Sequence, residues 1–76
     1  MIWNHRIVDV SDGTEEPIYE IREVFYNSKN EPVFHSDAAV VGENLDELQE
    51  LLYMFAEAFN KPILNSTTDF HNDIDN

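Results

Sequence analysis

The chain has 76 residues, no cysteine and a formal net charge of −12, from sixteen acidic and four basic residues. A chain of this length forms one domain at most and buries only about 60% of its unfolded surface; without cysteine, disulfides and thiolate metal sites are excluded. The four bases, Arg6, Arg22, Lys29 and Lys61, are scattered, so we expect no direct nucleic-acid binding and no docking on an anionic membrane.

The sequence shows no targeting or membrane-spanning segment. Its first ten residues, MIWNHRIVDV, lack a basic region followed by an apolar run. No apolar run approaches the ~20 residues that span a bilayer. We therefore expect a cytoplasmic protein. Because small domains without disulfides often rely on oligomerisation, self-association is the expected source of extra stability.

Three strands are predicted before residue 42. Residues 2–10 alternate, with Trp3, His5 and Ile7 on one face. Asp12–Gly13 is a strong turn signal, and residues 18–26, IYEIREVFY, are rich in β-branched and aromatic types. After a turn in NSKNEP, a third strand falls within VFHSDAAVV, residues 33–41. Short connections favour an antiparallel meander.

A helix is predicted from Asn44 to Lys61. Asn44 is a good N-cap and Glu47 can complete a capping box, while Pro62 cannot continue the helix. The apolar stripe comprises Leu45, Leu48, Leu52, Phe55 and Phe59, widened by Leu51, Ala56 and Ala58. It covers about 160°, more than the ~100° that suffices for a surface helix.

The fold class expected from this order is α+β, a three-stranded meander followed by one helix packed on one face (β-β-β-α). Residues 1–64 form the single domain. Residues 65–76 are polar and acidic without a sustained period, and are expected to be a flexible tail. Phe70 and Ile74 are the two tail side chains that can dock.

The second strand carries apolar residues on both faces, whereas one helix covers only one face of a sheet. Each large side chain left in water forgoes roughly 1.5–3 kcal/mol. We therefore expect a homodimer, because most soluble homo-oligomers are two-fold dimers. The residues predicted for self-association or docking are Trp3, Ile18, Val24, Tyr26, Leu51, Tyr53 and Ala58.

Candidate chemistry is weak. His5, Glu23, His35 and Asp37 come from three strands, and a metal or acid–base site could use them if they converge. The alternative is ordinary cross-strand pairing. The chain has two glycines, so no Gly-rich phosphate loop is present, and none of its serines lies in a nucleophile elbow. We predict no catalytic residue, no metal and no cofactor.

Two resemblances follow from these segments. Three antiparallel strands, then GENLDEL at 42–48 opening a helix, resemble the N-terminal domain of HicB-type antitoxins. The resemblance implies a truncated ribonuclease-H-like fold without nuclease residues, dimers or tetramers, and inhibition of a small RNA-cleaving toxin. Antitoxins of this type usually continue into a DNA-binding segment, which this sequence does not show, so operator binding is not carried over.

The second resemblance is to a group of small uncharacterised bacterial proteins. It is carried by Trp3, Asn4 and Arg6, by the pattern Y-I-EV-Y from Tyr19 to Tyr26, by G-L-EL through Leu48, and by Pro62 after the helix. No activity comes with it.

The expected function is a non-enzymatic, acidic protein–protein interaction module, a homodimer with an antitoxin-like or regulatory role. One alternative is a phage-type inhibitor whose acidic surface imitates nucleic acid. The other is a small metal-dependent enzyme using His5, Glu23, His35 and Asp37.

Overall fold

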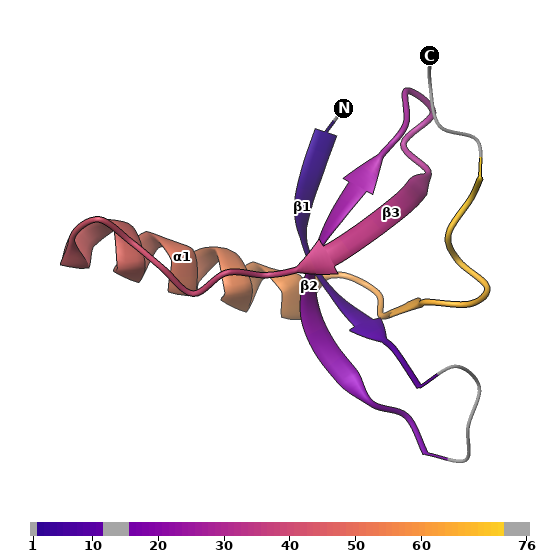
Figure 1. Cartoon of the computed structure of the whole chain (residues 1–76), viewed down its shortest axis with the longest axis horizontal. Coiled ribbons are helices and arrows are strands. Elements are labelled where there is room, and N and C mark those ends of the chain that lie inside the picture. The colour runs from indigo at the N-terminus through magenta and orange to yellow at the C-terminus, as the bar shows by residue number, and fades with distance from the viewer. Residues whose placement is uncertain (1, 12–15, 73–76) are drawn as a thin grey trace.

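A curled four-stranded sheet and one helix make up the fold (Figure 1). The computed structural model describes residues 2–11 and 16–72. The elements follow in the order β1 (Ile2–Asp9), β2 (Tyr19–Tyr26), β3 (Pro32–Asp37), α1 (Leu45–Glu57), the 3₁₀ turn η1 (Ala58–Asn60) and β4 (Leu64–Asn65). The turn predicted at Asp12–Gly13 lies outside the described residues.

The antiparallel pairing of the first three strands is confirmed. β1 pairs with β2 from Ile2↔Tyr26 to Asp9↔Tyr19, and β2 pairs with β3, with a register shift between Phe25 and Tyr26. The β2–β3 turn is built by Asn27, whose side-chain oxygen accepts from the backbone N–H of Lys29 and Glu31 at 3.0 Å each. An asparagine side chain that imitates a backbone turn in this way explains the turn signal in the sequence.

The sheet has a fourth strand that the sequence did not predict. Its order is β3-β2-β1-β4, and β4 runs parallel to β1 through the pairs Val8↔Leu64 and Asp9↔Asn65. The three-stranded meander is therefore wrong as a complete description, and the sheet is mixed. Two residues are too few to show a period of two, so β4 left no readable signal.

The helix begins where predicted. The side chain of Asn44 accepts from the Glu47 N–H at 2.9 Å. The Glu47 carboxylate accepts from the backbone N–H of Glu43 at 3.2 Å, one residue before the expected partner. Gly42 lies so close to this helix start that a Cβ there would be 2.7 Å from the Leu48 nitrogen, which restricts the position to glycine. Together, Gly42, Glu43, Asn44 and Glu47 thus fix the residue at which α1 begins.

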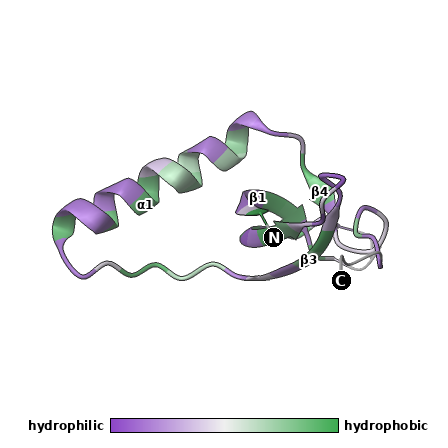
Figure 2. Ribbon diagram, turned by 90° about the horizontal axis from the view of Figure 1, so that it is seen from above, coloured by the Kyte–Doolittle hydropathy of each residue, from purple (hydrophilic) through white to green (hydrophobic). Residues whose placement is uncertain are grey.

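The helix extends away from the sheet. Figures 1 and 2 show α1, and the segment that leads to it from β3, leaving the sheet in the same direction. We call residues 38–60 the arm. None of the thirteen residues of α1 is buried. Its best-packed ring is Phe55, whose centroid is 4.8 Å from that of His5, and Ala58 in the following turn is fully buried. The helix thus contacts the sheet only near the helix's own C-terminal end. We expected the whole helix to pack on one face of the sheet, and this is wrong for most of its length.

The register divides the sheet into two faces. Side chains of Asn4, Arg6, Val8, Val24 and Tyr26 share the face that we call the C-terminal face. Val8 and Val24 are completely buried there, with Val10, Leu64 and Phe70 packed on the cluster. The opposite side, the helix face, carries Trp3, His5, Ile7, Phe25 and Phe34.

Residues 65–72, which the sequence assigns to the tail, have defined partners. The Asn65 side chain accepts from Thr67 and Thr68, and the Asp69 carboxylate accepts from the Asn65 N–H at 2.7 Å. The His71 N–H donates to the Pro32 carbonyl at 2.8 Å. The Phe70 ring lies 4.6 Å from that of His35. This segment closes the C-terminal face.

Candidate functional site

The arm exposes a large share of the chain's apolar side chains. Leu45 is 82% exposed, Leu52 55% and Phe59 68%, although all three belong to the predicted apolar stripe. Leu48 and Phe55 of the same stripe are half-buried. Tyr53, Met54, Val40 and Val41 add to the exposed set. Figure 2 shows apolar and polar stretches alternating along the helix, and an apolar stretch in the middle of the segment that leads to it. Scattered apolar residues are normal on a surface, but several on one protrusion make the arm the candidate interaction surface.

A second apolar area lies on the helix face of the sheet. The rings of Phe25 and Phe34 stack across the β2–β3 pair with centroids 4.9 Å apart, and Trp3 lies 6.4 Å from Phe25. Trp3 is 44% exposed and Phe34 50%. We call Trp3, Phe25 and Phe34 the aromatic patch. The arm of the same chain leaves this patch open.

The seven residues predicted for the interface separate into two groups. Trp3, Ile18 and Tyr53 are exposed, and Leu51 is half-buried. The other three, Val24, Tyr26 and Ala58, are buried within the chain and are not available to a partner. The prediction treated the C-terminal face as open, whereas Phe70 and Leu64 cover Val24 and Tyr26. Ala58 is buried in η1, at the joint between the arm and the sheet.

The aromatic patch was missed except for Trp3. Phe25 and Phe34 are direct partners across β2 and β3. The sequence lacked the strand register that brings them together, and register depends on tertiary structure as well as on alternation. The exposure of Val40, Val41 and Phe59 was not predicted. The sequence placed the two valines at the end of the third strand and Phe59 in the apolar stripe of the helix, which was expected to pack on the sheet.

The candidate metal ligands do not converge. His5 and Glu23 are direct partners on the helix face, whereas His35 and Asp37 share the opposite face with Arg22. Across residues 2–11 and 16–72, no group of three or more His, Asp or Glu side chains lies close enough to hold a metal ion. The arrangement proposed for a metal-dependent enzyme is therefore not formed.

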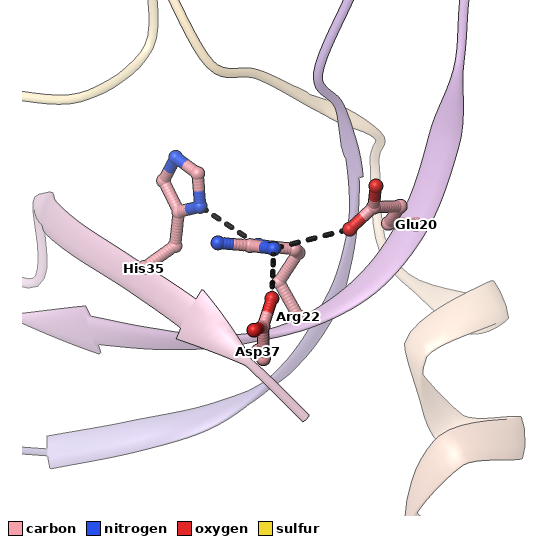
Figure 3. A network of polar contacts seen from close by, with 4 residues as sticks. All are labelled: Glu20, Arg22, His35 and Asp37. Atoms are coloured by element: carbon pink, nitrogen blue, oxygen red, sulfur yellow. Dashed lines mark hydrogen bonds and ion pairs between the residues drawn. The ribbon is translucent and has the colours of Figure 1, made fainter. Parts of the chain in front are cut away.

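On the C-terminal face, Arg22 organises a polar cluster (Figure 3). Its Nη1 contacts Glu20 at 3.0 Å and Asp37 at 2.7 Å, and its Nε donates to His35 Nδ1 at 2.9 Å. Burial, then the nearby Arg22 charge, lower the pKa of His35, while Glu20 opposes the shift. Since Nδ1 accepts a hydrogen bond, His35 is held as the neutral tautomer with its proton on Nε2. The cluster is a cross-strand brace between β2 and β3.

On the helix face, His5 is only 4% exposed, between the rings of Trp3 and Phe55. Burial lowers the pKa of His5, and the Glu23 charge partly counteracts this. Neither ring nitrogen has a hydrogen-bond partner among the described residues. His5 thus acts as a packing residue in the joint between α1 and β1.

Comparison with known proteins found no match: no family model, no curated protein and no solved structure corresponds to the chain. Within the described part of the chain, no helix is both long and apolar enough to cross a bilayer.

Proposed function

We propose that the protein is a cytoplasmic, non-enzymatic interaction module that forms a homodimer and binds another protein in an antitoxin-like or regulatory role. The observation that carries the proposal is the apolar arm, whose stripe residues Leu45, Leu52 and Phe59 are more than half exposed. The order β-β-β-α and the glycine-led helix start are the features on which the antitoxin-like part rests.

The size of the single chain supports association. The radius of gyration of its Cα atoms is 13.3 Å, against about 11.4 Å for a compact chain of this length. Its accessible surface is 5489 Å², against roughly 4,800 Å² for a globular monomer of 8.9 kDa. The excess, roughly 700 Å², is close to the ~800 Å² that each partner buries in a standard interface. A second copy is therefore an occupant of suitable size.

Two open apolar areas on one chain fit a two-fold arrangement. In such an interface residue i contacts residue j while j contacts i. The arm of one copy can then cover the aromatic patch of the other, and the reverse. Trp3 and Tyr53 supply aromatic groups of the kind that dominate interface energies.

Light scattering coupled to size exclusion tests the dimer. We expect a species of twice 8.9 kDa at high concentration. Leu52→Glu places a charge within the stripe and keeps helix propensity, so we expect it to shift the protein to monomer. Glu50→Gln also changes the charge by one unit, but at an exposed position about 160° around α1 from Leu52, and is the control, which stays dimeric. A clean 8.9 kDa species for the unmodified chain would refute the homodimer.

The runner-up function, an acidic inhibitor that occupies a nucleic-acid groove on its target, has one observation in its favour. Asp46, Glu47, Glu50 and Glu57 are all exposed, and α1 contains no basic residue. Such an inhibitor predicts binding to a basic target that weakens steeply with salt, unlike binding through the apolar stripe. A salt titration of any complex isolated with the protein separates the two.

A further inference from the structure

Residues from three parts of the sequence meet at Arg6. Its Nη1 donates to the Tyr26 hydroxyl at 2.9 Å, and its Nη2 donates to the Pro62 carbonyl at 2.6 Å. The Tyr26 hydroxyl donates in turn to the Asn4 side-chain oxygen at 2.7 Å. All four positions belong to the larger pattern that the sequence analysis described, and the arm and the aromatic patch contain none of them.

The direction of these hydrogen bonds leaves donors free. Because the Asn4 oxygen accepts from Tyr26, the Asn4 amide N–H groups point elsewhere and have no partner among the described residues. A guanidinium carries five N–H donors, and two of those of Arg6 are used. Its Nε has no partner in the described part of the chain, but it is buried and a ligand in an open hollow does not reach it. The donors of Arg6 that can serve a ligand are the remaining N–H groups of Nη1 and Nη2, since Arg6 lines a hollow of the surface.

Beside the hydrogen bonds of Arg6 and Tyr26 lies a hollow of about 290 Å³. Its lining residues are Ile2, Asn4, Arg6, Tyr26, Asn30 and Lys61. Two of the chain's four Lys and Arg residues therefore share one small hollow, in a chain with sixteen acids, and none of the lining residues is acidic. The lining is rich in hydrogen-bond donors and carries two positive charges.

The contrast with Arg22 shows what is missing. Arg22 has two carboxylate partners, Glu20 and Asp37. Within residues 2–11 and 16–72, neither Arg6 nor Lys61 forms an ion pair. Two like charges brought together without a counter-charge repel each other, and an anion between them removes that repulsion.

We propose that this hollow is a binding site for a small oxyanion, a carboxylate or a phosphate. The Arg6 guanidinium offers N–H groups in the planar geometry that matches two oxygens, and Lys61 supplies a point charge. The Asn4 amide completes the donor set. Asn30, held at a φ of 62°, forms part of the wall from the β2–β3 turn. The site is independent of the dimer, because no residue of the arm's exposed stripe or of the aromatic patch lines it.

NMR titration of the ¹⁵N-labelled full chain tests the site. Inorganic phosphate and acetate are added separately at constant ionic strength, with sodium chloride as the reference salt. We expect saturable shifts centred on the Asn4 side-chain amide, the Arg6 Nε–H and the Asn30 amide. Saturation by phosphate alone identifies phosphate as the ligand class; saturation by acetate as well extends it to carboxylates. Shifts that stay linear with both anions, as with chloride, would overturn the proposal and leave Arg6 as a structural clasp.

Three variants sharpen the result. Lys61→Gln removes one charge from the hollow and weakens binding about fivefold, whereas Lys29→Gln makes the same charge change elsewhere and leaves it unchanged. Asn4→Asp keeps the oxygen that accepts from Tyr26 but replaces the free N–H donor with a negative charge. We therefore expect this variant to lose anion binding while its NMR spectrum remains that of a folded protein. Equal affinities for the two lysine variants would contradict the site.

Discussion

The C-terminal segment and the helix lie over opposite faces of one sheet, and the less apolar of the two closes its face more completely. Residues 64–72, largely polar, lie over Val8 and Val24, which are fully buried. The helix α1 is rich in leucine and aromatic residues, yet none of its residues is buried. Burial here depends on where the chain returns to the sheet. β4 fixes the C-terminal segment against β1, whereas α1 meets β1 only near Phe55.

We expect substitutions on the two faces to differ most in how the resulting loss of stability depends on protein concentration. Val24→Ala removes two methyl groups from a fully buried site and should lower the free energy of unfolding by about 2–3 kcal/mol at every concentration. Leu52→Ala removes an exposed side chain, so it should destabilise the protein only where dimers form. Urea unfolding of both variants over a dilution series measures this. A concentration-independent loss for Leu52→Ala would show that the arm packs on its own sheet.

Phe70 tests whether the C-terminal segment is an essential cover. Its ring packs on His35 and on the Val8–Val24 cluster but is only half-buried. Phe70→Ala should therefore cost about 1–2 kcal/mol, less than a fully buried phenylalanine. The urea midpoint gives the value, and Thr68→Ala, at an exposed position of the same segment, is the control. If Phe70→Ala left the midpoint unchanged, the segment would not stabilise the sheet.

The smallest expected effect is the pH dependence of stability. The pKa values of His5 and His35 are lowered by burial in the folded chain, so the unfolded chain binds more protons. Stability is therefore complete above the ordinary histidine pKa of 6.5 and falls as the pH drops below it.

Urea midpoints at about pH 7.5 and about pH 5.5 measure this loss. His35→Gln removes the histidine of the C-terminal face from this pH-dependent loss of stability, and His5→Gln removes the histidine of the helix face. Each variant should show a smaller loss on acidification than the unmodified chain. A change on acidification that is the same in both variants as in the unmodified chain would contradict both assignments, because the variants isolate the histidines from the titration of the acidic residues.

Local signals predicted the local structure well. The alternation of residues 2–10 and 18–26 gave two strands that the structure confirms, and Asn44 is the N-cap that its sequence context predicted. These features depend on neighbours a few residues apart. The exact third strand was less clear because its apolar run continues through Val40 and Val41, which lie beyond Asp37 in the arm.

Long-range arrangement was not predictable in the same way. β4 is two residues long, and its pairing with Val8 joins residues that are far apart in the sequence. The burial of Val24 and Tyr26 depends on Phe70, which the sequence places in a polar stretch. The approach of Lys61 to Arg6 likewise needs the return of the chain at Pro62. Each case requires knowledge of where a distant segment lies.

The position of α1 outside the core separates the residues that stabilise the fold from those of the proposed interaction surface. Since the sheet and its C-terminal cover contain the buried side chains, the outward residues of the helix are free to vary without loss of the fold. If the proposed function holds, exchange of Leu45, Leu52 and Tyr53 changes the choice of partner and not the fold. The helix is consequently a natural place to graft new specificity, with Asn44 and Gly42 kept to hold its starting point.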